Sequence, residues 1–337
     1  QSVPYVIAGS VMWEYLMESG PACCYPSVND LFTTTLGGIA VGEVLWRLSN
    51  AILDDSTSGF ERFLREAGAF VVYPIYGAQR LIAGDAFAHG PAGESRYPYS
   101  GEVSIGASVF GSGSIEDFAV IPRYRLRHGQ VSELEGEIQA FDHFNMDIAL
   151  GLSKDGVAGA TFDATALLAG KKSPLGDTAE GVVGFALDFD YFENVIASLG
   201  QSGLGGLAAI EVPLQSEFSF FGRLVLVGSF GAVSSDYPDI RHYNVGFGTT
   251  TRLWLELRHR RWGEIYARLD HYWVHTISGE PGDEVAGLAD VGASVRLHPS
   301  VGLGFHYLLA DKRGLYKNAA DTEEMIHLGE VYAAWRF

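Results

Sequence analysis

From about residue 97 to the carboxyl terminus, hydrophobic and polar residues alternate along the chain, and this pattern predicts β-strands. In "RLWLELR", for example, Leu253, Leu255 and Leu257 fall on one side of an extended segment and the residues between them fall on the other. Several such segments run to about ten residues, the length that a tilted strand needs to cross a bilayer. The predicted strands are 100–111, two within 118–141, 144–153, 157–169, 181–192, 204–217, 219–232, 242–258, a partner strand ending at 275, 285–297, 300–311 and 325–337.

Two predicted hairpins place opposite charges face to face. In the first, a turn at Gln130 would pair Arg127 with Glu133, Arg125 with Glu135, and Arg123 with Glu137. In the second, a turn near Arg261 would bring Arg258 to Glu264 and Arg252 to Asp270, with Glu256 and Arg268 on the same strands. We call these twelve residues the predicted charge ladder. A slip of one residue would destroy the match, so the charges indicate the register.

The first 96 residues have a helical pattern instead. The segments 4–19, 25–55 and 59–73 are apolar runs without strict alternation, and Ser27 and Asp30 follow Pro26 in a spacing typical of helix starts. The stretch 31–53 approaches the length of a transmembrane helix, but Glu43 and Arg47 interrupt it, so we expect it to pack against protein. We therefore expect a small α-helical region over 1–96, acting as a plug or a periplasmic cap, and a β-barrel over 97–337.

The charges of the predicted ladder favour a membrane barrel with a wet lumen, but a soluble barrel could present the same charges to water, so the carboxyl terminus decides between the two. An arginine or lysine on a lipid-facing strand costs about 2–4 kcal/mol at mid-depth, whereas a wet lumen accepts it. The last residue, Phe337, follows hydrophobic positions that step back by two, which resembles the carboxyl-terminal signal that hands outer-membrane barrels to their assembly machinery. The sequence predicts a membrane all-β fold, a transmembrane antiparallel β-barrel. The predicted strands number 12 or 13, and because bacterial single-chain barrels have even strand numbers, we expect about 12.

The amino-terminal part carries the most specific motifs. "GSVMWEYLMES" and "YPSVNDLFTTTLGGIAVGEVLWRLS" resemble the W-E-Y-x-x-E and P-S-x-N-D-L-x-x-T-T-x-G-G-x-x-x-G-E signature of a bacterial family of uncharacterised function. "YPIYGAQRLIAGD", "FDHFNMD" and "RHYNVGFG" fit later blocks of that family. The resemblance implies an outer-membrane barrel of a Gram-negative bacterium, and it implies little about activity.

Composition supports this fold and excludes one class of partner. The 337 residues include 42 glycines and 12% aromatic residues, which suits many strands with tight turns and aromatic belts. The net charge is -18, so the chain lacks the clustered lysine and arginine that a nucleic acid needs. We expect outer-membrane lipids or lipopolysaccharide as partners, and the barrel-assembly machinery during biogenesis. We expect no cofactor, because no ligand set for a metal is recognisable.

The densest polar set in apolar surroundings lies in the helical region. Its members are Glu14, Glu18, Asn29, Asp30, Thr33, Thr34 and Glu43. Carboxylates that are drawn together raise one another's pKa and can form an acid/base pair or bind a cation, which makes Glu14, Asp30 and Glu43 catalytic candidates. Helix caps and ion pairs explain the same residues without a substrate.

Two hypotheses about function follow. The first is an outer-membrane barrel with a charged lumen and associated helices, which serves passage, docking or envelope organisation without bond-making chemistry. The alternative is a lipid-modifying outer-membrane enzyme that uses the carboxylates of the helical region.

Overall fold

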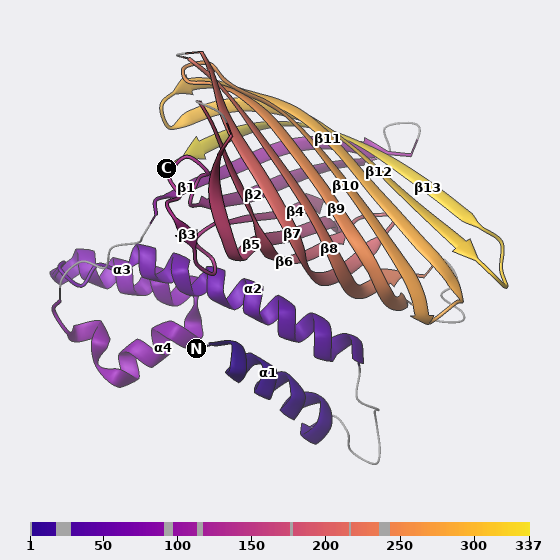
Figure 1. Cartoon of the computed structure of the whole chain (residues 1–337), viewed down its shortest axis with the longest axis horizontal. Helices are drawn as coiled ribbons and strands as arrows, with labels where there is room; N and C mark the ends of the chain where they lie inside the picture. The colour runs from indigo at the N-terminus through magenta and orange to yellow at the C-terminus, as the bar shows by residue number, and fades with distance from the viewer. Residues whose placement is uncertain are drawn as a thin grey trace.

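The protein folds into a β-barrel with four α-helices at its amino-terminal side (Figure 1). The computed structural model describes residues 2–17, 28–90, 97–112, 117–175, 178–215, 217–235 and 243–337. The helices are α1 (Ser2–Met12), the π-helix η1 (Trp13–Met17), α2 (Val28–Ile52), α3 (Gly59–Val72), α4 (Pro74–Ala83) and the 3-10 helix η2 (Asp85–Phe87). The strands are β1 (Tyr99–Gly111), β2 (Asp117–His128), β3 (Glu137–Ile138), β4 (Phe144–Ser153), β5 (Gly156–Leu175), β6 (Ala179–Glu193), β7 (Ser198–Gln215), β8 (Phe218–Ser234), β9 (Tyr243–His259), β10 (Gly263–Ser278), β11 (Gly282–His298), β12 (Val301–Tyr316) and β13 (Thr322–Arg336).

The barrel is a closed antiparallel meander. Apart from the two-residue β3, the 12 long strands pair with their neighbours in chain order, and β1 pairs with β13 to close the circle. Glu102 stands opposite Arg336 at this seam, and the backbone N–H of Gly101 donates to the carbonyl of Phe337 at 2.9 Å. The predicted strand number is therefore confirmed.

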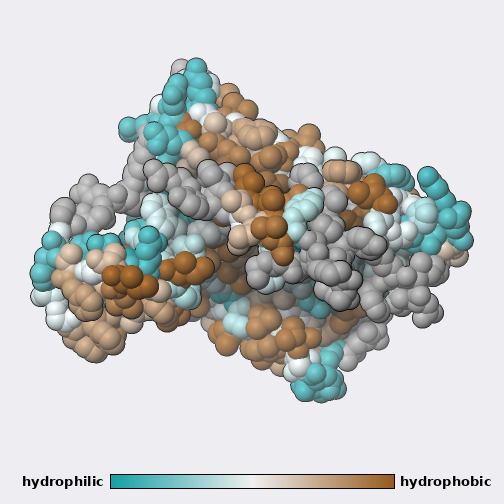
Figure 2. Space-filling view, turned by 90° about the horizontal axis from the view of Figure 1, so that it is seen from below, coloured by the Kyte–Doolittle hydropathy of each residue, from teal (hydrophilic) through white to brown (hydrophobic). Residues whose placement is uncertain are grey.

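The two faces of the barrel wall differ in polarity as predicted. On β13, Val331 and Trp335 are 62% and 57% exposed on the outside, whereas Glu330 is buried on the inside. On β12, Phe305 faces outward while His306 and Lys312 are buried. Figure 2 shows hydrophobic residues over much of the barrel wall, with hydrophilic residues gathered at its extremities. An apolar exterior around an ionic interior is the arrangement of barrels that span membranes.

Helix α2 lies against the outer wall of the barrel. On the outer face of β6, Phe185 is 50% exposed while Leu187, two residues on, is 1% exposed. The difference arises because Ile39, Ala40 and Val44 of α2 pack into one cluster with Leu187 and with further outward-facing residues, namely Leu126, Phe144, Met146 and Ala166. The expected packing of this stretch against protein is thus confirmed. Figure 1 shows all four helices outside the barrel, so they do not fill the lumen, and a cap role for residues 1–96 stays a prediction.

The segment between β2 and β4, residues 129–143, enters the lumen with its apolar residues Val131, Leu134 and Ile138, and we call it the inner segment; Ala140 and Phe141 near its end contact α2. The three inward residues share a buried cluster with inward-facing residues of β5 to β10. The cluster contains Tyr97, Val131, Leu134, Ile138, Leu167, Val182, Ala186, Leu207, Ala209, Phe221, Val225, Val227, Trp254 and Tyr266. Val131 and Leu134 have no exposed surface. The first predicted hairpin is therefore wrong.

The predicted partners of the β2 arginines lie elsewhere. Arg125 of β2 stands opposite Asp147 of β4, not Glu135. Glu133 accepts a hydrogen bond from the backbone N–H of Gln130 at 3.0 Å, and Glu137 pairs with Lys171 in the short β3. Three glutamates with matching spacing mimicked a strand, but the apolar residues among them turn the segment inward.

The pair α3 and α4 also has a polar interior. Arg80 of α4 donates to Glu66 of α3 and to Asp55, both at 2.8 Å, and Arg62 approaches the same two carboxylates. These contacts raise the pKa of the Arg80 guanidinium, with the hydrogen bond to Glu66 as the largest cause. The outer sides of the two helices carry exposed apolar residues, among them Phe60, Phe63, Val71, Ile75 and Ile82. No helix among the described residues is long and apolar enough to cross a membrane.

Candidate functional site: the charged lumen

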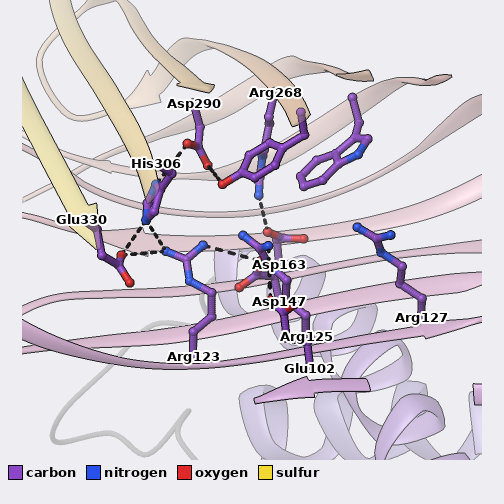
Figure 3. A network of polar contacts seen from close by, with 12 residues as sticks. Glu102, Arg123, Arg125, Arg127, Asp147, Asp163, Arg268, Asp290, His306 and Glu330 are labelled. Atoms are coloured by element: carbon purple, nitrogen blue, oxygen red, sulfur yellow. Dashed lines mark hydrogen bonds and ion pairs between the residues drawn. The ribbon is translucent and has the colours of Figure 1, made fainter. Parts of the chain in front are cut away.

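Ionisable side chains from seven strands meet across the middle of the lumen (Figure 3). We call this group the central network, and it comprises Arg123, Arg125, Asp147, Asp163, Arg268, Asp290, His306 and Glu330. Each lies on the inward face because the alternation of its strand puts an apolar neighbour against lipid or α2. Arg123, Arg125, Asp147 and Asp163 lie on the paired neighbours β2, β4 and β5, and closure of the barrel brings them to Arg268, Asp290, His306 and Glu330.

Charge-assisted hydrogen bonds hold the central network. Arg125 Nε donates to Asp147 Oδ2 at 2.8 Å, and Arg268 Nη1 donates to Asp163 Oδ2 at 2.8 Å. The two ring nitrogens of His306 lie 3.1 Å from Asp290 Oδ1 and 2.5 Å from Glu330 Oε2. Arg123 Nη2 lies 3.5 Å from Glu330 Oε2. Bonds of this kind are stronger than neutral ones, so the network ties opposite walls of the barrel together.

Arg252 forms a second centre beside this network. Its side chain is 1% exposed and approaches four carboxylates, those of Asp163, Asp188, Asp190 and Asp270. Arg252 Nη1 also donates to the hydroxyl of Thr165 at 3.0 Å. A buried guanidinium keeps its proton, so it offsets part of the negative charge that these aspartates concentrate here.

Aromatic rings and further ion pairs fill the lumen nearer the carboxyl terminus. The rings of Trp254 and Tyr266 are stacked with centroids 5.0 Å apart, and the guanidinium of Arg127 lies 5.6 Å from the Trp254 ring. Arg127 Nη2 also donates to Glu256 at 3.2 Å, while Arg336 donates to Glu102 at 2.7 Å. With the inner segment, these contacts occupy this half of the barrel.

Two cavities flank the central network. The larger, of about 140 Å³, extends toward the opposite end of the barrel, where Gly159, Asn194 and Val195 line it. The smaller, of about 30 Å³, lies on the side of the aromatic rings. Asp147, Asp163 and Arg268 line both cavities. The network therefore separates them.

The structure bears out the register of the second predicted hairpin. Arg258 stands opposite Glu264 and Arg252 stands opposite Asp270 across β9 and β10. Arg252 and Asp270 form an ion pair at 3.3 Å, whereas Arg258 pairs with Glu256 on its own strand. A functional role for these residues stays a prediction.

The polar set of the helical region is only partly described. Glu14 is buried in η1, Thr34 is exposed on α2, and Glu43 accepts from Arg47 Nε at 3.1 Å. Glu18 and the side chains of Asn29, Asp30 and Thr33 lie outside the described residues. The catalytic candidates Glu14, Asp30 and Glu43 thus stay a prediction. In the described part of the chain, no group of three or more His, Cys, Asp or Glu side chains is arranged to hold a metal ion.

The sequence contained a signal for the central network that the predicted ladder did not use. Single aspartates interrupt apolar strands in "FNMDIALGL", "ATFDATALL" and "GLADVGA", and these are Asp147, Asp163 and Asp290. A lone carboxylate in the middle of such a strand has to face the lumen. His306 sits in the same way in "GLGFHYLL".

A comparison with protein families finds a match for the amino-terminal part of the chain. Residues 1–75 match a family described as "Domain of unknown function (DUF3943)". A comparison with curated proteins gives no match.

Solved structures of outer-membrane barrels resemble the chain at low identity. An outer-membrane channel from Pseudomonas putida F1 has 12% identity and a TM-score of 0.38, over 73% of this chain and 97% of that one. A NanC porin has 8% identity and a TM-score of 0.37, over 69% of this chain and 98% of that one. A KdgM porin has 8% identity and a TM-score of 0.32, over 70% and 99%. With TM-scores below 0.5, these likenesses add no evidence on the function of this chain.

Proposed function

We propose that this protein is an outer-membrane passage for small polar solutes, which the central network and the inner segment hold closed. The observation that carries the proposal is the pair of cavities inside a charged lumen, separated by the ion-paired residues Asp147, Asp163 and Arg268. A scaffold alone needs no open space in its interior. Ion pairs can exchange partners with an entering solute, so they suit a closure that opens.

The connections between strands support an orientation in the membrane. The connections 260–262 and 299–300 lie at the end of the barrel that holds the carboxyl terminus, whereas 317–321 lies at the other end together with the short connections 154–155 and 279–281. Outer-membrane barrels have short periplasmic turns and longer outer loops. In this orientation the larger cavity faces the cell exterior and the inner segment faces the periplasm. We expect two partners at this location: outer-membrane lipids around the wall, and the barrel-assembly machinery during biogenesis.

Conductance in planar bilayers tests the proposal. Replacing Val131, Leu134 and Ile138 by serine removes the apolar anchors of the inner segment without changing the chain length. We expect the full-length parent to pass little current and the triple variant to pass at least about tenfold more, since about 1.4 kcal/mol off a closed state changes an equilibrium tenfold.

A matched control carries the same chemical change outside the lumen. Ile7, Val11 and Leu16 are exposed apolar residues of α1 and η1, and their replacement by serine should leave the current at the parental level. Folding of each variant is checked by the mobility of unheated samples in SDS gels. If the folded inner-segment variant conducts no more than the parent, the passage proposal fails.

A further inference from the structure

Within the described part of the chain, one inward-facing arginine has neither a hydrogen-bond nor an ion-pair partner. Arg223 lies on β8, opposite Trp254 of β9, and is 7% exposed. Among the described residues it makes no hydrogen bond or ion pair, and its Nε is buried without an acceptor. Every other arginine of the lumen named above pairs with a carboxylate. A guanidinium cannot lose its proton in a protein, and a buried charge without compensation costs several kcal/mol, on the order of 3–5.

The surroundings of Arg223 are rich in donors. It lines the smaller cavity together with three other arginines, Arg125, Arg127 and Arg268, and with Asn145. The side-chain amide nitrogen of Asn145 is also buried without an acceptor. Two carboxylates, Asp147 and Asp163, line the same cavity. Arg125, Arg127 and Arg268 each pair with a further carboxylate, namely Glu102, Glu256 and Asp270, so Arg223 is the guanidinium of this lining that lacks one.

The two carboxylates do not satisfy Arg223. Asp147 Oδ2 accepts from Arg125 Nε at 2.8 Å, and Asp163 Oδ2 accepts from Arg268 Nη1 at 2.8 Å. In Figure 3, Arg127 stands apart from the group formed by Asp147 and Asp163, and it pairs with Glu256 at 3.2 Å. Arg223 Nε and the Asn145 amide thus supply unused N–H donors to this space, and Asp147 Oδ1, an unused acceptor of the same lining, bonds to neither of them.

We infer that the smaller cavity is a binding site for a small inorganic anion of the size of chloride. Its volume of about 30 Å³ exceeds the 10–15 Å³ that a single water requires, so it admits an ion of this size. The site adjoins the central network, because three members of that network, Asp147, Asp163 and Arg268, line the smaller cavity. Only its role as a step for anions through the lumen rests on the proposed function; the binding itself does not.

The binding is tested by the unfolding midpoint of the full-length protein in detergent micelles. Sodium chloride is compared with sodium gluconate at equal ionic strength, because gluconate supplies the same charge in a larger molecule. A ligand that binds only the folded state stabilises it in a concentration-dependent manner. We expect chloride to raise the midpoint by several degrees and the effect to saturate.

The variant Arg223→Met removes the charge that requires the anion. We expect it to abolish the difference between the two salts, and to raise the midpoint in gluconate relative to the parent. Arg313→Met is the control, because Arg313 lies at the outer end of β12 with a half-exposed side chain, and it should keep the parental response to chloride. A parent with equal midpoints in both salts, or an Arg223→Met variant that keeps the chloride response, overturns the inference.

A second variant keeps the test decisive if Arg223→Met does not fold. Asn145→Leu removes one donor without changing the charge, and we expect the chloride concentration at half-saturation to rise about tenfold, which corresponds to the loss of one hydrogen bond to a charged group. An unchanged half-saturation overturns the site as assigned. Both readouts are independent of conductance, so failure of the anion site and failure of the passage proposal are distinguishable.

Discussion

At the residue scale, Arg252 is the common ion-pair partner of several carboxylates in the lumen. It faces four aspartates and is 1% exposed, so its removal leaves negative charges without their common partner. We expect Arg252→Met to lower the free energy of unfolding by about 3–5 kcal/mol, which is the range for breaking buried ion pairs. Denaturant unfolding followed by tryptophan fluorescence measures the change.

The control for this prediction is an exposed ion pair between an arginine and a carboxylate. Arg313 and Glu323 lie 3.0 Å apart with side chains 51% and 61% exposed, and pairs of this kind contribute about 0–1 kcal/mol. A loss in Arg252→Met no larger than the loss in Arg313→Met would show that water reaches the Arg252 centre.

His143 of the inner segment predicts a dependence of stability on pH. Burial is the main cause that lowers its pKa from 6.5 to about 4, against a hydrogen bond from its Nδ1 to the carbonyl of Gly129 that raises it. The unfolded chain therefore takes up the proton first as the pH falls. Stability that is fully present above pH 6.5 is lost as the pH falls toward 4, by at most about 1.4 kcal/mol per unit.

The variant His143→Gln isolates this contribution. Glutamine can donate to the Gly129 carbonyl but does not titrate, so its stability should fall less than that of the parent between pH 7 and pH 5. Chemical denaturation at each pH measures both proteins. Parallel losses in the two proteins would assign the pH dependence to other groups.

The residues of the site were predictable to different degrees. The inward position of Arg123, Arg125, Arg252 and Arg268 follows from alternation, which is a local property of each strand. Among their partners, Asp270 of Arg252 follows from local pairing. Asp147 does not, because β4 and not the inner segment pairs with β2, and Asp163 and Glu330 reach Arg268 and Arg123 only in the closed barrel. The free Arg223 was not identified either, since a missing partner is visible only when all neighbouring strands are in place.

At the element scale, the contact between α2 and β6 depends on a glycine. A Cβ atom on Gly37 would lie 2.6 Å from the ring of Phe189, whereas one on Gly42 would have its nearest neighbour, the Tyr73 hydroxyl, at 4.0 Å. Alanine is better than glycine within a helix by about 0.8–1 kcal/mol when there is room. We expect Gly42→Ala to stabilise the protein and Gly37→Ala to destabilise it, as measured by denaturant unfolding.

A double variant checks the physical reason. Phe189→Ala removes the ring that Gly37→Ala would meet, so the cost of Gly37→Ala should shrink in that background. An equal cost in both backgrounds would mean that α2 does not approach β6 as closely as the structure shows.

The two predicted hairpins show what sequence can determine about elements. The turn between β9 and β10 is local, with Gly263 at a positive φ of 132°, so charge matching found the register. The inner segment has Gly129 and Gly136 at positive φ values of 63° and 62°, which break an extended strand. Its apolar residues Val131, Leu134 and Ile138 are three and four apart, a spacing that does not suit one face of a strand. Charge spacing alone therefore predicted a strand wrongly, and the spacing of the apolar residues argues against that strand.

At the scale of the whole molecule, the sequence predicts the barrel but not the place of α2. Leu187 under α2 and Phe185 beside it are both outward-facing apolar residues, although their exposures are 1% and 50%. Lipid chains and an apolar helix face select the same residue types, so alternation cannot distinguish a wall that faces lipid from one that faces a helix.

This equivalence leads to a prediction for the barrel without its helices. The outer-wall residues that α2 covers, including Leu126, Phe144 and Met146, are apolar and can meet lipid instead. We expect a chain that begins at residue 91 to assemble in lipid vesicles and to show the mobility of a folded barrel when unheated samples are run on SDS gels. Besides the cover of α2, it loses two hydrogen bonds, from Arg47 Nη2 to the carbonyl of Ala140 and from the hydroxyl of Tyr99 to the carbonyl of Arg47.

The substitution Leu187→Arg tests whether the wall that α2 covers lies in the bilayer once the helices are removed. In the shortened chain, Leu187→Arg should lower stability by about 2–4 kcal/mol near the middle of the bilayer and by about 0–1 kcal/mol near its surface, because the cost depends on depth. Comparison with Phe185→Arg, an outward residue two positions away that is half exposed beside α2, calibrates this depth. If the shortened chain never gains the folded mobility in lipid, α2 is a required part of the wall, and the helices and the barrel form one folding unit.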